Sequence, residues 1–206
     1  EGRKMRKTAI LALLATLLFS TVPAAHSQVP PSASELAAYS GPHRAAAEGD
    51  IAALQADIAA GENLNARDAA GRTPFHVAAF ARQTKLMQAL ANSGADVNAL
   101  EGQAYDAVTI AAVADDVETL KAALSLGNKA GNITSPYDGS ALIAAAHLGH
   151  DEVVRILIEA GAPLNHVNNL GWTALIEAVI LGDGGPRHQK TVAYLVKAGA
   201  DKGGGE

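Results

Sequence analysis

The sequence of 206 residues contains no cysteine, and only 4% of its residues are aromatic. The absence of cysteine excludes a disulfide framework and thiolate chemistry, and it fits an oxidising or a reducing compartment equally well. Because 49% of the chain is nevertheless hydrophobic, we expect an interior of small Ala and Leu side chains, as in closely packed helices. The length suits one sizeable domain.

Positive charge is also scarce. The chain has 16 basic and 21 acidic residues, which gives a formal net charge of −5. Residues 1–27 hold four of the basic residues and one of the acidic ones, so the rest has 12 basic and 20 acidic residues and a net charge of −8. That balance repels a polyanion, and we therefore expect no nucleic-acid partner.

The first 27 residues have the three-part pattern of a secretory signal peptide. A basic stretch, Arg3–Lys7, precedes the apolar run Thr8–Val22, and the small residues Ala25-His26-Ser27 predict cleavage before Gln28. The apolar run is shorter than the ~20 residues that a bilayer core requires. We therefore expect export to the periplasm or another secreted location, with no stable membrane insertion after cleavage. The alternative is an uncleaved membrane tether.

Three further boundaries follow from local composition. Met5 is a more natural start than Glu1, so residues 1–4 are expected to lie upstream of the true start. Residues 28–39, with Pro30-Pro31, are expected to form a linker that leads into the domain and is irregular from Gln28 to Ser34. Residues 202–206 form a Gly-rich tail, and no polar end cap precedes it, so we expect that the natural chain continues or that this end is truncated.

The central part of the chain repeats with a period of about 33 residues. An Ala-Ala pair recurs at steps of 33, 33 and 34 residues, and a near-copy follows after 33 more. These pairs are Ala45-Ala46, Ala78-Ala79, Ala111-Ala112, Ala145-Ala146 and Ala178-Val179. A glycine follows the first Ala of each pair by 16 residues in four units and by 21 in the fifth. The spacing predicts repeats near 40–67, 68–100, 101–134, 135–167 and 168–201.

Each unit predicts a short Ala-rich helix, a turn and a longer helix. Val153, Val154, Leu157 and Ile158 form an apolar stripe at helical spacing in the longer helix of the fourth unit. A Gly-Ala pair then ends the helix, where glycine adopts the left-handed C-cap conformation without steric cost.

These motifs carry a resemblance to a known family. Thr73-Pro74-Phe75-His76-Val77-Ala78-Ala79 resembles the ankyrin signature T-P-L-H-x-A-A, and Gly149–Ala162 resembles the signature of the second helix. The resemblance covers residues 40–201 and implies an all-α solenoid of about five helix-turn-helix units with projecting hairpin-like loops. It also implies a concave face of loops and inner helices that binds protein partners. The residues that carry the motif are His43, Thr73, Pro74, His76, Gly94, Gly161, Thr173 and Gly199.

The sequence departs from that pattern in two places. The third unit reads Asp106-Ala107-Val108-Thr109 where the box should be, and the fourth and fifth carry Ile143 and Ile176 in place of the boxed His. A five-residue insertion lies within Gly182–Lys190, between the helices of the fifth unit.

No constellation for catalysis or metal binding stands out. His147 and His150 are three residues apart, but no third ligand has local spacing. The pair Asp115-Asp116 precedes a helix and is explained by N-terminal capping. We therefore expect a non-enzymatic protein without cofactors. A metal-binding or hydrolytic envelope enzyme with a site near the 182–190 insertion is the alternative.

The candidate binding residues lie in the loops and in the insertion. Aromatic side chains at loop tips are typical interface anchors, although each could instead pack on the adjacent loop. The candidate partner-binding residues are Arg72, Tyr105, Tyr137, Asp138, Asn168, Asn169, Trp172, Arg187 and His188. The sequence therefore predicts an exported monomer that binds an unidentified protein.

Overall fold

The computed structural model describes residues 28–201, so the predicted signal peptide and the Gly-rich tail lie outside it. Across this described part the chain forms eleven α-helices and no strand. An isolated antiparallel bridge joins Thr134 to Gly139 in one of the loops. The predicted all-α class is confirmed. No helix between residues 28 and 201 is long and apolar enough to cross a membrane.

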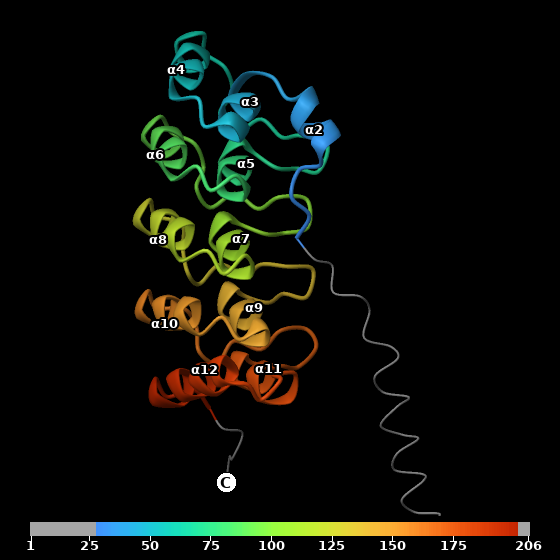
Figure 1. Ribbon diagram of the computed structural model, residues 1–206, viewed down its shortest axis with the longest axis vertical. Helices are drawn as coiled ribbons and strands as arrows, with labels where there is room; N and C mark the ends of the chain where they lie inside the picture. The colour runs from blue at the N-terminus through green and yellow to red at the C-terminus, as the bar shows by residue number, and fades with distance from the viewer. Residues whose placement is uncertain (1–27, 202–206) are drawn as a thin grey trace, which may run out of the picture.

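Ten of the helices form five pairs that stack in chain order as two layers (Figure 1). Each predicted repeat contains one pair. The inner helices are α3 (Gly41–Glu48), α5 (Pro74–Phe80), α7 (Ala107–Val113), α9 (Ala141–Leu148) and α11 (Ala174–Ile180). The outer helices are α4 (Ile51–Ala59), α6 (Thr84–Asn92), α8 (Val117–Ser125), α10 (Asp151–Glu159) and α12 (Pro186–Lys197).

Short polar residues set the start of the inner helices, and glycines follow the outer ones. Thr173 and Asp106 each accept a hydrogen bond from a backbone N–H in the first turn of their helix. Gly94, Gly161 and Gly199 have φ angles of +91°, +82° and +95°, as the C-cap prediction requires.

The core is continuous through the stack because small side chains let the inner helices approach closely. Ala46, Ala79, Ala112 and Ala146 occupy one column of the repeat and are at most 3% exposed. Leucines of the outer layer lie behind them, among them Leu120, which is fully buried. No repeat buries these faces alone, so stability comes from packing between neighbours.

The lead-in is irregular over residues 28–32, which is two residues short of the predicted end of the irregular stretch at Ser34, and the helix α2 (Ala33–Ala38) follows. Ser32 and Glu35 form a capping box at its start: Ser32 Oγ accepts from the Glu35 N–H, and Glu35 Oε2 accepts from the Ser32 N–H. The prediction gave weight to the prolines and overlooked this Ser-x-x-Glu signal.

The predicted insertion divides into a short turn and an extra length of helix. The turn spans residues 181–185, and α12 then runs for 12 residues, against nine in each of the other outer helices. The turn follows the C-terminal end of α11, whereas the loop that precedes α11 leads into its N-terminal end. The turn and that loop therefore lie at opposite ends of α11.

Candidate functional site

Four hairpin-like loops project from the starts of inner helices, and all close in the same way. In each, a side-chain oxygen accepts a hydrogen bond from the backbone N–H four residues later. The acceptor–donor pairs are Asp68–Arg72 at 2.8 Å, Glu101–Tyr105 at 3.0 Å, Ser135–Gly139 at 3.3 Å and Asn168–Trp172 at 3.0 Å. This closure fixes the shape of each loop before any partner arrives.

Backbone hydrogen bonds join successive loops along the stack. The N–H of Gly102 donates to the Ala70 carbonyl at 2.9 Å, and the N–H of Ser135 donates to the Ala104 carbonyl at 2.8 Å. Asn169 N–H donates in the same way to the Tyr137 carbonyl at 2.9 Å. The four loops therefore form one connected surface.

Each boxed histidine forms a hydrogen bond with a backbone carbonyl in, or just before, the loop that follows it. His43 Nε2 lies 2.9 Å from the Arg72 carbonyl, and His76 Nε2 lies 2.9 Å from the Ala99 carbonyl. Because His76 Nδ1 accepts from the Thr73 N–H, its Nε2 carries the proton and donates. Burial lowers the pKa of His76 to about 4, so the ring is neutral near pH 7.

The third repeat replaces the histidine with a buried carboxylate network. Asp106 caps α7 through Oδ1, while its Oδ2 accepts from the side-chain amides of Asn128 and Asn132, both at 2.9 Å. Asn128 also accepts from the Val108 N–H. The degenerate box is therefore compensated by residues at the start of the next loop.

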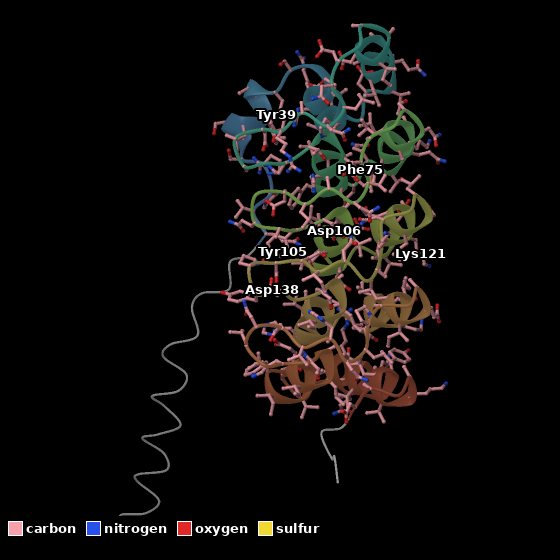
Figure 2. All side chains as sticks on the ribbon, turned by 180° about the vertical axis from the view of Figure 1, so that it is seen from behind. Tyr39, Phe75, Tyr105, Asp106, Lys121 and Asp138 are labelled. Carbon is pink, nitrogen blue, oxygen red and sulfur yellow. The ribbon has the colours of Figure 1, made fainter. Side chains whose placement is uncertain are left out.

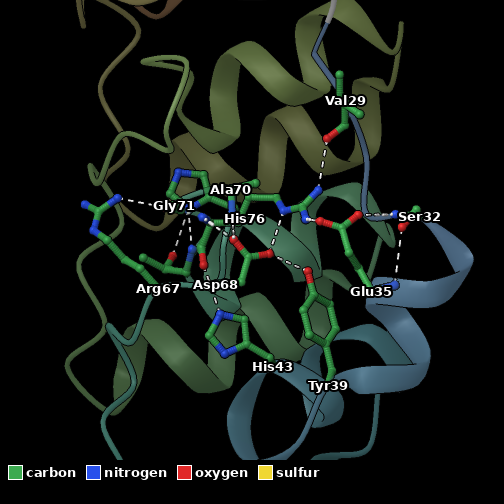
Figure 3. A network of polar contacts seen from close by, with 12 residues as sticks. Val29, Ser32, Glu35, Tyr39, His43, Arg67, Asp68, Ala70, Gly71 and His76 are labelled. Carbon is green, nitrogen blue, oxygen red and sulfur yellow. Dashed lines mark hydrogen bonds and ion pairs between the residues drawn. The ribbon is translucent and has the colours of Figure 1, made fainter.

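Arg72 was predicted to bind a partner, but its residue is only 1% exposed. Its Nε donates to Asp68 Oδ2 at 2.7 Å, its Nη2 is paired with Glu35, and its Nη1 donates to the Val29 carbonyl at 3.2 Å (Figure 3). Tyr39 completes the network by donating its hydroxyl to Asp68 Oδ2 at 2.6 Å. The lead-in covers this side chain, so Arg72 is not exposed to a partner while the lead-in is in place.

Hydrogen bonds lower the pKa values of both carboxylates in this network. The backbone and hydroxyl of Ser32 lower the pKa of Glu35, with a further contribution from Arg72. Burial raises the pKa of Asp68, but hydrogen bonds from Tyr39 and Arg72 outweigh it and give a net lowering. Both carboxylates are therefore ionised beside the guanidinium at neutral pH.

Tyr105 and Asn168 are also buried, which contradicts the expectation that they project from loop tips. Tyr105 occupies the column of Arg72 and packs into the core cluster. Asn168 closes its own loop and directs its amide toward Glu177 at 3.4 Å. Both residues shape the loops from beneath.

The other loop candidates gather on the third and fourth loops. Asp138 and Asn169 are exposed, and Tyr137 and Trp172 are half-buried. Figure 2 places Asp138 on the loop edge of the stack, with Lys121 on the opposite edge among the outer helices. The Asp138 carbonyl accepts from His166 Nε2 at 2.6 Å, which ties the two loops together.

Sequence reasoning missed three apolar residues on the same two loops. Ile133, Val167 and Leu170 are 45–53% exposed. The sequence did carry a signal for them, because they are apolar residues in otherwise polar loops and lie outside any apolar helical stripe. They extend the exposed part of the loop surface beyond the predicted residues.

Arg187 and His188 lie in the first turn of α12, away from the loops, so the two predicted surfaces do not meet. Arg187 bridges Asp115 of the third repeat at 2.8 Å and Asp151 of the fourth at 2.8 Å. His188 lies over Gly149 and donates from Nε2 to the His147 carbonyl at 3.0 Å, and its Nδ1 lies 2.7 Å from Asp183 Oδ1. Both residues bind the insertion to the stack.

The other histidines and the Asp115-Asp116 pair that the sequence singled out also have partners within the stack. His147 Nδ1 lies 2.9 Å from the buried Glu177 carboxylate, and this hydrogen bond raises the pKa of His147. His150 Nδ1 lies 2.9 Å from the Ala112 carbonyl. Asp116 caps α8, as predicted, while hydrogen bonds from Arg187 lower the pKa of Asp115. Within residues 28–201, no group of three or more His, Asp or Glu side chains could hold a metal ion.

Comparison with known proteins agrees with this architecture. Two family models match, one for three copies of ankyrin repeats over residues 108–204 and one for many copies over residues 43–90. The ankyrin repeat protein YahD of Escherichia coli (strain K12) is 32% identical over 157 residues, which cover 76% of this chain and 78% of YahD.

Solved structures are similar as well. The crystal structure of an ankyrin repeat domain from Acinetobacter baumannii AYE matches with a TM-score of 0.72 and 42% sequence identity. The match covers 78% of this chain and 81% of that domain. The repeat motifs, the paired helices and these relatives show that the chain belongs to the ankyrin repeat family, whose members are typically non-catalytic protein-interaction domains.

Proposed function

We propose that this protein is exported and binds a protein partner through its third and fourth loops, without catalysing a reaction. The observation that carries the proposal is the exposure of Ile133, Val167 and Leu170 beside Tyr137 and Trp172. Apolar and aromatic side chains on a fixed frame are typical anchors of protein interfaces. The family relationship supports the same kind of activity.

The rigidity of these loops supports binding with little ordering cost. The His166–Asp138 contact and the Asn169–Tyr137 backbone bond hold the two loops in one register. Binding to a pre-organised surface loses less conformational entropy than binding to mobile loops. The exposed carboxylate of Asp138 on the third loop favours, at this surface, a partner segment that is apolar or basic over an acidic one.

Site-specific photo-crosslinking tests this surface. A photoreactive phenylalanine analogue at Leu170 is expected to capture a discrete partner, whereas the same analogue at exposed Lys121 on α8 captures none. Adding Trp172→Ala to the Leu170 probe should weaken capture several-fold. Equal capture from both positions, or capture that is indifferent to Trp172→Ala, would show that the surface is wrong.

Export and monomeric state need separate measurements. Mass spectrometry of the protein from the cell envelope should find an N-terminus at or near Gln28, because the signal-peptide pattern predicts cleavage there. Intact residues from Met5 onward in the membrane fraction would instead support the tether. Light scattering of the purified chain should give the mass of a single copy, and a dimer mass would contradict the expected monomer.

A further inference from the structure

The lead-in of residues 28–39, here called the strap, is attached to the stack by polar contacts and by one aromatic ring. None of the residues of α2 is buried, and Val29 and Leu36 are 59% and 43% exposed. Its polar attachments are the bonds from Arg72 to Glu35 and to the Val29 carbonyl, and the bond from Tyr39 to Asp68. The partly buried ring of Tyr39 packs against the core, with its centroid 5.3 Å from that of the His43 ring. A segment with so little buried apolar surface opens locally at a small fraction of the global unfolding free energy.

The guanidinium of Arg72, which lies beneath the strap, has two edges with different partners. Arg72 Nε is held by Asp68 of its own loop, four residues away, and this bond does not depend on the strap. Nη1 and Nη2 instead face the strap, where a backbone carbonyl and a carboxylate accept from them (Figure 3). When the strap leaves, these donors lose their protein partners and become accessible to water or to another acceptor.

We propose that the Arg72 edge is a second binding site, which takes an acidic segment of a partner protein and is filled in cis by the strap. The planar guanidinium fits a carboxylate together with a nearby backbone carbonyl, as Glu35 and Val29 show within the chain itself. The partner segment would replace both contacts and displace the strap. This site lies at the first loop, and it does not depend on the surface proposed for the third and fourth loops.

The strap's attachment is tested by hydrogen–deuterium exchange on the full chain. Glu35→Gln removes the charge that faces Arg72 but keeps a side chain that can still form the capping box. The α2 amides, such as that of Leu36, are expected to exchange at least tenfold faster, while those of α7 are unchanged. Glu48→Gln is the matched control, because it removes a carboxylate from the exposed Arg44–Glu48 pair. Unchanged exchange of α2 in Glu35→Gln would overturn the proposal.

Occupancy of the site is tested with a peptide of the same sequence as residues 28–39. Measured by fluorescence anisotropy, the peptide should bind the full-length Glu35→Gln chain at least tenfold more tightly than the wild-type chain, whose strap competes. A peptide with Gln at the position of Glu35 should bind at least tenfold more weakly, and high salt should weaken both. If the two peptides bind alike, or if neither binds, the carboxylate site is wrong even where the strap has loosened.

Discussion

The two ends of the stack differ in how the terminal repeat is covered. At the first repeat, the strap and the Arg72 network cover the loop side of the end unit. At the fifth repeat, α11 leaves Ile176, Val179 and Ile180 exposed. Val179 is 58% exposed, whereas Ala146, in the same column one repeat earlier, is fully buried. The difference shows that burial in a solenoid is decided by the next neighbour along the stack, and only secondarily by residue type.

The largest expected effect is at the N-terminal anchor. Arg72→Met should lower the free energy of unfolding by about 3 kcal/mol, because it leaves the Asp68 carboxylate without its main partner. Arg187→Met, at the half-exposed C-terminal anchor, should cost less than about 1 kcal/mol. Urea unfolding of the two variants makes the comparison, and equal losses would contradict the contrast between the ends.

Acid should act on the N-terminal half through His76. Its folded pKa of about 4 lies below the ordinary value of 6.5, so the unfolded chain binds a proton that the folded chain excludes. This contribution to stability is complete above pH 6.5 and declines by about 2–3 kcal/mol as the pH falls to 4. Urea midpoints between pH 7 and pH 4 measure the decline, which should be much smaller in His76→Gln.

His147, in the C-terminal half, should affect the pH dependence of stability in the opposite direction. Its pKa is raised by Glu177, so its contribution is present below the ordinary pKa and is lost as the pH rises through the folded value. The ring is partly exposed, so solvent screening keeps this effect smaller than that of His76. Titration of the two rings by NMR separates them: His147 should titrate above pH 6.5, and His76 well below it.

A matched exchange in the Ala column tests the role of the neighbour directly. Ala146→Val should destabilise by about 1–3 kcal/mol, because the added methyl groups meet a packed inner helix. Val179→Ala should change stability by less than about 0.5 kcal/mol, since nothing covers that position among the described residues. Thermal unfolding of both variants gives the answer, and a large loss in Val179→Ala would mean that another copy covers this face.

A small gain in stability is expected in the middle of the stack. Ala104 has a φ of +62°, in a loop position where the first and fourth loops have Gly71 and Gly171. Ala104→Gly should stabilise by about 0.5–1 kcal/mol by relieving the left-handed conformation. Ala70→Gly, at the preceding loop position of the first loop, should destabilise slightly. If both variants lose stability equally in urea unfolding, the strain at Ala104 is negligible.

Much of the fold was predictable from the sequence because the same pattern of residues recurs in five repeats. The columns of Ala pairs and of glycines at the ends of the longer helices predicted the helix pairs and their order. The strap does not repeat, so no column could reveal α2. Its only signal was the capping box of Ser32 and Glu35.

The candidate site was predicted less well, and the reason lies in one column. Arg72, Tyr105 and Trp172 share a position, yet only Trp172 is appreciably exposed. Their burial depends on what lies over them: the strap covers Arg72, and no further loop follows Trp172 in the described chain. A single sequence gives the residue at such a position, but it does not show which other element packs over that residue in the fold.

The reach of Arg187 has a consequence for how the stack comes apart. By bridging Asp115 and Asp151, it connects the fifth repeat to its second neighbour as well as to its first. In a chain of units that contact only adjacent ones, the terminal unit can fray alone. Here, melting of the last repeat also removes a contact from the third. Local unfolding from this end is therefore coupled over three repeats. The contact increases the cooperativity of unfolding in the C-terminal half, although α11 leaves an exposed face.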